Sequence, residues 1–276
     1  MGTLGIILTV LASLILVFVC AWLYLAAPSR YDKRMDKYKN TKYAHRGLHG
    51  DGACENSLSA FRRAAEAGFG IELDVRLAGD GRLVVFHDDS LIRVCGIDKK
   101  VNELSTEELR SVKLGETEDC VPTFLEVLEL IGGRVPLLIE IKMEPGEDAV
   151  AEELLREIEG YNGDFIIESF NPRALRIIRE ARPDILRGFL SMEYSKTERF
   201  GGKAVYRALE YLLLDFLYRP NFIAYDKSGR DKPYLKLIRK LFRVPMLAWT
   251  VKSAEEEKEC SGVFDSVIFE GYMPER

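Results

Sequence analysis

The chain has 276 residues, of which 47% are hydrophobic and 30% are charged, and its net charge at pH 7 is −5. This composition is typical of a folded globular protein, and the acidic balance gives no support for a nucleic-acid partner. The five cysteines are scattered without CxxC spacing, which argues against a disulfide framework and favours free thiols.

The first predicted element is an apolar helix over residues 3–27, a segment without a charged side chain. At about 1.5 Å per residue it would be about 37 Å long, enough to cross a hydrocarbon core of about 30 Å. Trp22 and Tyr24 near its end are typical of the membrane interface. A cleaved signal peptide is the alternative, but it would have basic residues first and a shorter apolar run. We therefore expect a transmembrane helix.

Residues 28–41 are polar and are expected to form a short juxtamembrane linker. A cluster of basic side chains follows the helix: Arg30, Lys33, Arg34, Lys37, Lys39 and Lys42. Such clusters tend to remain in the cytoplasm. The sequence thus predicts a single-pass protein of the cell membrane whose main domain, residues 42–276, lies in the cytoplasm.

Within residues 42–276, short apolar runs alternate with helical patterns. Strands are expected at 42–46, 70–75, 82–87, 136–141, 164–169, 185–190, 221–225, 245–251 and 265–269. Helices are expected at 56–68, 105–112, 122–131, 147–160, 172–181, 203–217, 231–242 and 253–260. This alternation predicts parallel βαβ units, and runs such as Leu137–Ile139 suit strands covered on both faces.

Two α/β architectures fit this order, a closed (β/α)8 TIM barrel and an open doubly wound sheet. No GxGxxG or GxxxxGK[ST] follows the first strand, which disfavours nucleotide-binding open sheets. Polar residues fall at the ends of many strands, where TIM barrels build their active sites. Residues 78–81 predict a hairpin turn without a helix. With nine strands expected, one therefore lies outside the barrel.

Carboxylates and histidines gather at these strand ends. Glu72 and Asp74 are spaced i, i+2, so both side chains leave the same face of a strand and can converge on one hard cation. His45 and His87 follow two other strands, and Glu140 ends a further one. The polar set predicts a site at one mouth of the barrel.

Read together, these motifs resemble the glycerophosphodiester phosphodiesterase family. They appear in family order as His45-Arg46-Gly47, Cys54-Glu55-Asn56-Ser57, Glu72-Leu73-Asp74, His87-Asp88, Val121-Pro122-Thr123, Glu140-Ile141-Lys142, Ser169-Phe170-Asn171-Pro172 and Trp249-Thr250-Val251. Cys54 replaces the usual Pro, and Lys252 stands where the family often has Asn. The resemblance implies hydrolysis of glycerophosphodiesters to sn-glycerol 3-phosphate and an alcohol.

The resemblance also implies roles for particular residues. Glu72, Asp74 and Glu140 would hold one divalent cation, and all-oxygen ligation suits Mg²⁺ or Ca²⁺. His45 and His87 would exchange protons as general acid and base. The sequence does not assign which is which, nor whether water or a substrate hydroxyl attacks.

Two alternative roles are predicted for each of the remaining site residues. Arg46 and Lys142 bind phosphate or form surface salt bridges. Asn56 positions His45 or binds the phosphate, and Glu55 is a metal ligand or supports one. Trp249 forms an apolar wall for the substrate or fills the barrel.

The small-molecule substrate itself has alternatives. The predicted anchor places the site near lipid, so lysophospholipase D-type hydrolysis of membrane lysophospholipids is a second hypothesis. A third is a non-catalytic binding protein on the same fold. Head group and oligomeric state are not predicted.

Overall fold

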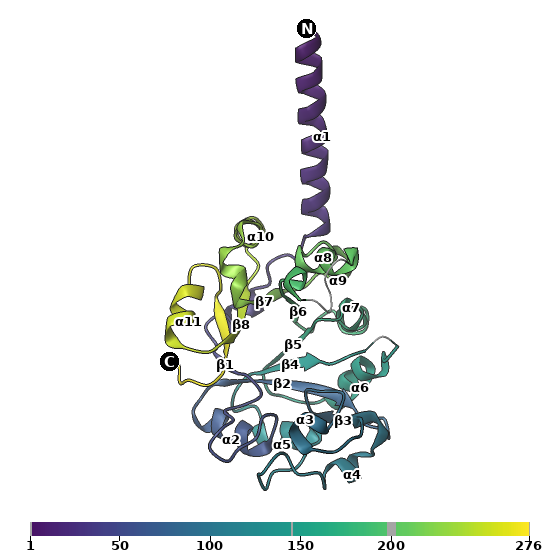
Figure 1. Cartoon of the computed structure of the whole chain (residues 1–276), viewed down its shortest axis with the longest axis vertical. Coiled ribbons are helices and arrows are strands. Elements are labelled where there is room, and N and C mark those ends of the chain that lie inside the picture. The colour runs from purple at the N-terminus through teal and green to yellow at the C-terminus, as the bar shows by residue number, and fades with distance from the viewer. Residues whose placement is uncertain (1, 145, 198–202, 276) are drawn as a thin grey trace.

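The computed structural model describes residues 2–144, 146–197 and 203–275, and consists of a barrel domain from which one long helix projects (Figure 1). The barrel strands are β1 (Tyr43–Ala44), β2 (Gly70–Leu77), β4 (Leu137–Ile141), β5 (Phe165–Ser169), β6 (Arg187–Ser191), β7 (Phe222–Asp226), β8 (Met246–Val251) and β9 (Ser266–Phe269). All neighbouring pairs among them are parallel, and β1 pairs with both β9 and β2. The sheet is therefore a closed eight-stranded barrel, which confirms the predicted TIM fold and excludes the open sheet.

The ninth strand, β3 (Leu83–Val85), lies outside the barrel. It pairs antiparallel with the end of β2, from Val75↔Val85 to Leu77↔Leu83. This is the hairpin predicted from the turn at residues 78–81. It continues into a loop that brings His87 to the mouth of the barrel, where Arg76 Nε donates a 2.8 Å hydrogen bond to the His87 carbonyl oxygen.

Helices surround the barrel: α2 (Leu58–Glu66), α3 (Ile92–Cys95), α4 (Thr106–Leu109), α5 (Phe124–Ile131), α6 (Ala149–Glu157), α7 (Pro172–Ala181), α8 (Ala204–Glu210), α9 (Asp215–Tyr218), α10 (Pro233–Phe242) and α11 (Ala254–Cys260). Among these helices, α4, α7 and α11 have N-terminal caps, since the side chains of Ser105, Asn171 and Ser253 accept hydrogen bonds from backbone N–H groups of the first turn. The single helix expected at 203–217 is wrong. Leu212 has φ +61°, a left-handed conformation that separates α8 from α9.

Two apolar cores result from strand alternation. One lies between the strands and the helices. The other fills the barrel, where Leu138 is fully buried and shares its strand face with Glu140. In β4 and β5 the earlier interior position is apolar (Leu138, Ile166), whereas the next interior position is a glutamate (Glu140, Glu168). This gradient places the chemistry at the carboxyl ends of the strands.

Residues of the predicted linker close the opposite end of the barrel. Residues Lys33–Lys37 form the 3-10 helix η1, and Met35 is fully buried with Tyr38 in the interior core. Arg34 Nη1 donates to the carbonyl oxygen of Asp184, just before β6, and Lys37 pairs with Asp164, just before β5. We call Lys33–Tyr38 the plug, because it covers the amino ends of the strands.

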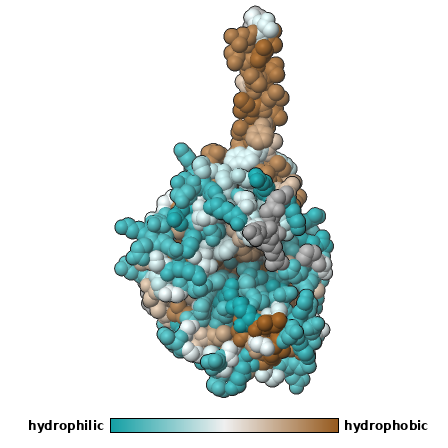
Figure 2. Space-filling view, in the orientation of Figure 1, coloured by the Kyte–Doolittle hydropathy of each residue, from teal (hydrophilic) through white to brown (hydrophobic). Residues whose placement is uncertain are grey.

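The projecting helix is α1 (Thr3–Leu25), the one described helix long and apolar enough to cross a membrane (Figures 1 and 2). Its end is bonded to the link between α9 and β7. Arg219 Nη1 donates to the Ala27 carbonyl oxygen across 2.9 Å, and Ser29 Oγ donates to the Arg219 carbonyl oxygen across 2.7 Å. The ring of Tyr24 contacts that of Phe216, with centroids 5.8 Å apart. The apolar helix is therefore fixed to one side of the barrel.

Candidate active site

Three buried carboxyl groups converge at the mouth of the barrel. Glu72 and Asp74 leave the interior face of β2, and the β2–β4 register sets Asp74 beside Glu140. One oxygen from each of the three groups lies within 4.8 Å of the others. The predicted set is therefore brought together, at a separation that suits a single hard cation with oxygen ligands.

The three carboxyl groups differ in their acidity. Burial, reinforced by the charges of Asp74 and Glu140, raises the pKa of Glu72 well above its usual value. Burial also raises the pKa of Glu140 to about 7, although the Lys142 ammonium opposes it. Burial disfavours the charge on Asp74 too, but the positive charges of Lys142 and Arg46 help to hold its pKa well below the usual range. The cluster has more carboxyl groups than its cations neutralise, which fits a site for an added cation.

Cationic and amide groups surround Asp74. Lys142 Nζ lies 2.7 Å from Glu140 Oε1 and 3.1 Å from Asp74 Oδ1. Asn56 Nδ2 donates a 2.8 Å hydrogen bond to Asp74 Oδ2, and Arg46 Nε lies 3.4 Å from the same oxygen. Among the described residues, buried Asp74 Oδ1 has the Lys142 ammonium as its ion-pair partner and accepts no hydrogen bond. A buried carboxylate oxygen whose contact is a cation has the chemistry of a cation ligand.

His45 is held by the residue that follows the last strand, Glu270. Its Nδ1 donates a 2.6 Å hydrogen bond to Glu270 Oε2, and the β1–β9 register, which ends at Ala44↔Phe269, makes the two residues neighbours. The hydrogen bond from His45 and the charge of Lys252 lower the pKa of Glu270 to about 2. An ionised carboxylate only accepts hydrogen bonds, so the proton of neutral His45 sits on Nδ1 and Nε2 is free to accept one.

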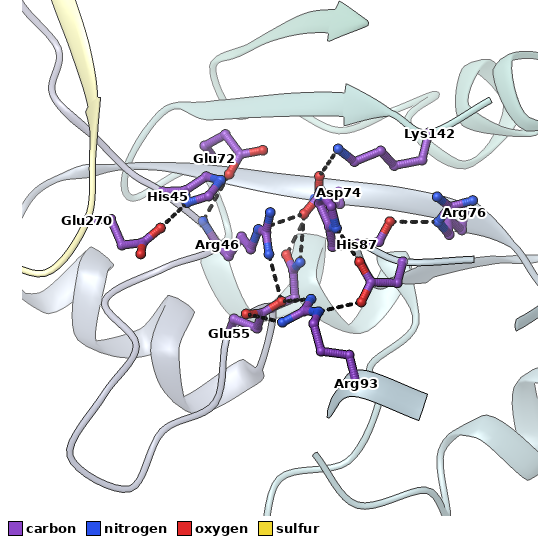
Figure 3. A network of polar contacts seen from close by, with 12 residues as sticks. His45, Arg46, Glu55, Glu72, Asp74, Arg76, His87, Arg93, Lys142 and Glu270 are labelled. Atoms are coloured by element: carbon purple, nitrogen blue, oxygen red, sulfur yellow. Dashed lines mark hydrogen bonds and ion pairs between the residues drawn. The ribbon is translucent and has the colours of Figure 1, made fainter. Parts of the chain in front are cut away.

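His87 has the same arrangement on the other side of the network (Figure 3). Its Nδ1 donates to Asp88 Oδ1 across 2.6 Å. Burial lowers the pKa of His87 to about 4, against the favourable charge of Asp74, and burial likewise lowers the pKa of His45. Both imidazoles are thus neutral at pH 7, each with Nδ1 protonated and Nε2 available as a base.

Arg93 joins the two halves of the network. Its Nε lies 2.5 Å from Asp88 Oδ2, and its Nη2 lies 2.6 Å from Glu55 Oε1, which also accepts a 2.8 Å bond from Arg46 Nη1 (Figure 3). Burial disfavours the charge of Glu55, but the bonds from Arg93 and Arg46 hold its pKa below the usual value. Glu55 is therefore an ionised bridge between two arginines, away from the three-carboxylate cluster.

A cleft of about 1100 Å³ opens beside the cluster. His87, Glu140 and Lys142 line it, and its lining also includes apolar and aromatic side chains that we call the apolar wall: Met143, Phe170, Met192, Tyr194, Tyr206 and Leu209. Trp249 is not part of this lining; its ring packs edge-on against Phe170 with centroids 5.3 Å apart. The Trp249 indole Nε1 is buried and donates no hydrogen bond within the described residues.

Sequence analysis missed three residues near this site, Glu270, Arg93 and Glu168, and named Asp88 only as part of the His87-Asp88 motif, without a role. Glu168 is buried next to Glu140 in the β4–β5 register, and burial with the charges of Glu140 and Glu72 raises its pKa well above the usual value. Parallel alignment of predicted strand ends would have found Glu168 and Glu270. Arg93 gave no signal, because it lies on α3, which was not predicted.

Comparison with protein families supports a single assignment. The model of the glycerophosphoryl diester phosphodiesterase family matches residues 45–262. A glycerophosphodiester phosphodiesterase of Caldanaerobacter subterraneus subsp. tengcongensis is 37% identical over 164 residues, which are 55% of this chain and 67% of that relative.

Solved structures share the fold. A phosphodiesterase of Oleispira antarctica, in complex with the product sn-glycerol-3-phosphate, superposes with a TM-score of 0.71 at 24% identity, over 84% of this chain and 94% of that one. A glycerophosphodiester phosphodiesterase of Thermotoga maritima gives a TM-score of 0.64 at 28% identity, over 83% and 94% of the two chains.

Proposed function

The chain belongs to the glycerophosphoryl diester phosphodiesterase family of enzymes, and on this basis we propose that it hydrolyses glycerophosphodiesters to sn-glycerol 3-phosphate and an alcohol. The observation that carries the proposal is the convergence of Glu72, Asp74 and Glu140 at the barrel mouth, between two histidines that are each oriented by a carboxylate. Together they provide a cation site and two proton-transfer groups.

In this proposal Glu72, Asp74 and Glu140 hold one divalent cation, Mg²⁺ or Ca²⁺. When bound, such a cation supplies Lewis-acid stabilisation of negative charge on the phosphoryl oxygens. Lys142, which lines the cleft, and Arg46 bind the remaining phosphate charge. Asn56 holds Asp74 in place through its 2.8 Å hydrogen bond.

His45 and His87 move the protons. One neutral imidazole accepts the proton of the attacking water or glycerol hydroxyl at Nε2. The other imidazole takes up a proton from solvent before this step and donates it to the leaving alkoxide as the P–O bond breaks, and the base then releases its proton to solvent. Glu270 and Asp88 are positioning residues, since their carboxylates fix the tautomer and stabilise the imidazolium that forms. Which histidine is the base stays open.

The test is product release by the full chain in detergent. We expect sn-glycerol 3-phosphate from glycerophosphocholine in the presence of Mg²⁺ or Ca²⁺, and none in excess chelator. His45→Ala and His87→Ala should each lower kcat by about 10²- to 10⁴-fold. His49→Ala is the matched control, because His49 is the third histidine of the chain and is outside the network. Full turnover in chelator, or in either variant, would refute the mechanism.

A second candidate substrate is a lysophospholipid, favoured by the apolar wall of the cleft. An acyl chain would lie along Phe170, Met192 and Leu209 while the phosphodiester reaches the carboxylates. Turnover of lysophosphatidylcholine and glycerophosphocholine by the same preparation separates the two substrates. Met192→Asp should abolish only lysolipid turnover.

We also propose that α1 spans the cell membrane and that the barrel, residues 42–276, is the catalytic domain on its cytoplasmic side. The helix is 23 residues long and none of its residues is buried in the structure. The six basic residues that follow it support the cytoplasmic orientation. Protease accessibility of the barrel in intact cells, compared with inverted vesicles, tests the orientation.

A further inference from the structure

The face of the barrel next to α1 has the character of a membrane-contacting surface. Helices α8, α9 and α10 lie on the side from which α1 projects (Figure 1). Because Arg219 and Ser29 bond the end of α1 to the α9–β7 link, a bilayer crossed by α1 would meet this face of the barrel. This argument rests on the proposed transmembrane role of α1.

Helix α10 presents two kinds of side chain outward. Leu235 and Ile238 are fully buried against the barrel, whereas Leu237 and Leu241 are 44% and 52% exposed. The two exposed leucines are spaced i, i+4 and so form one stripe along the helix. Lys236 and Lys240, with the same spacing, form an adjoining stripe. Apolar and basic stripes side by side are typical of helices that lie in the membrane interface.

The basic residues of this face are not neutralised by the protein. Within the described part of the chain, Arg207, Lys236, Lys240 and Arg243 are exposed and form no ion pair. By contrast, Arg239 on the same helix lies 2.7 Å from Asp265. The unpaired charges are therefore available for an external anion, and a lipid headgroup at the bilayer surface is one.

The surface continues from α10 to the base of α1. The rings of Tyr211 and Tyr234 have centroids 5.0 Å apart and join the end of α8 to the start of α10. Val205, Tyr211 and Leu217 along α8 and α9 are each more than a third exposed. At the base of α1, hydrophilic and hydrophobic residues are mixed on the surface (Figure 2).

We propose that this surface, built from α10 with α8 and α9, rests on an anionic phospholipid bilayer beside α1. Leu237 and Leu241 insert at the level of the headgroups, and Lys236, Lys240 and Arg243 bind lipid phosphates. The barrel is then held at two places rather than tethered at one. Since Tyr206 and Leu209 of α8 line the cleft, the apolar wall of the cleft lies close to the membrane.

The experiment is photo-crosslinking in nanodiscs that contain phosphatidylglycerol and phosphatidylcholine. A diazirine amino acid replaces Leu241, Leu14 or Leu125 in the full chain, and lipid adducts are measured by mass spectrometry. Leu14 is exposed in the middle of α1, and Leu125 is a matched exposed leucine on α5, across the barrel from α1. We expect adducts at positions 14 and 241 and none at 125.

The charge component is tested with Lys236→Glu/Lys240→Glu, for which the adduct yield at 241 should fall at least about fivefold. Arg62→Glu/Lys99→Glu, two exposed cations on other elements, is the control and should leave the yield unchanged. In nanodiscs of phosphatidylcholine alone, the adduct yield at position 241 without the charge substitutions should fall as much as it does for Lys236→Glu/Lys240→Glu. Equal yield without anionic lipid would refute the headgroup contact.

The outcomes separate this inference from the proposals on which it depends. Lipid adducts at position 14 without adducts at position 241 would overturn the proposed contact of α10 with the bilayer. They would leave the proposed membrane span of α1 intact. Equal adduct yields at positions 241 and 125 would overturn the α10 contact as well, since the barrel would then meet lipid with no preferred face. No adduct at 14 overturns the anchor and this inference together, whereas release of sn-glycerol 3-phosphate in detergent is independent of all three results.

Discussion

The carboxylate of Glu270 accepts a 2.6 Å hydrogen bond from Nδ1 of His45, although the two residues are 225 positions apart in the chain. Closure of the barrel creates this pair, because the last strand returns to lie beside the first. Burial lowers the pKa of His45 and Glu270 opposes that effect, so the carboxylate controls both the direction and the basicity of the imidazole.

Glu270→Ala should therefore lower kcat by about 10- to 100-fold, the size of effect seen when a residue that orients a functional histidine is removed. The pKa of His45 should fall further, because the carboxylate that favours its charged form is gone. The acidic limb of the kcat/KM profile, measured between pH 4 and 8, should shift to lower pH. Glu257→Ala, which removes a nearby carboxylate outside the network, should leave the profile unchanged.

Arg93→Ala is expected to lower kcat by roughly 10- to 100-fold through misplacement of His87. The variant releases Asp88 and Glu55 together, so His87 loses the fixed orientation of its Nδ1 partner. Cation affinity, measured by calorimetry, should be unchanged, because Arg93 contacts none of the three clustered carboxylates. Arg110→Ala, which breaks a surface pair with Glu126, is the control. A loss of cation binding in Arg93→Ala would contradict this division of roles.

Cation binding should stabilise the fold, and it can be measured without turnover. At a free Mg²⁺ or Ca²⁺ concentration of about 100 times Kd, the free energy of unfolding should rise by about 2.7 kcal/mol. Scanning calorimetry of the full chain in detergent should record a higher Tm, which chelator reverses.

The matched variants are Glu140→Gln and Glu168→Gln, which change paired residues on the neighbouring strands β4 and β5. Glu140→Gln should abolish the cation-dependent rise in Tm, because it removes a ligand oxygen charge. Glu168→Gln should retain the rise, because the raised pKa of Glu168 already keeps this neighbouring carboxyl group uncharged. Retention of the rise in Glu140→Gln would exclude the assigned site.

The contribution of His87 to stability should decline as the pH falls from about 6.5 to about 4. Over this range the unfolded chain binds a proton at residue 87, whose ordinary histidine pKa is near 6.5, whereas folded His87 takes up its proton only near pH 4. At this residue the unfolded state binds more protons, so its contribution to the free energy of unfolding rises with pH across this window. In urea unfolding without cation, the free energy of His87→Gln minus that of His49→Gln should therefore become more positive as the pH falls from about 6.5 to about 4.

The sequence predicted those parts of the molecule that depend on local pattern. All nine strands were found, since each is a short apolar run, and the i, i+2 spacing of Glu72 and Asp74 correctly placed both on one face. The contacts of His45 with Glu270 depend instead on barrel closure, and no local pattern encodes that pairing. Glu140 was joined to Glu72 and Asp74 through the family resemblance, and the β2–β4 register brings it beside Asp74.

Elements that depend on tertiary contacts were missed. The plug contains Met35 among charged residues, and its burial is explained only by the open end of the barrel that it fills. The break at Leu212 has a similar cause, because the apolar run 203–217 favours a continuous helix. In the structure the chain turns there, and the side chain of Leu212 is fully buried.

The plug has a consequence for any released form of the enzyme. A protease that cuts between Pro28 and Asp32 would leave Met35 and Tyr38 seated in the barrel, and the shed domain would keep its interior closed to water. A cut between Tyr38 and Lys42 would instead leave those two side chains on the fragment that carries α1 and uncover the amino ends of the strands. On the proposed topology, in which α1 spans the membrane, only the first cleavage would release a barrel with an intact core, so the position of the cut, rather than loss of the helix, decides whether the released barrel survives.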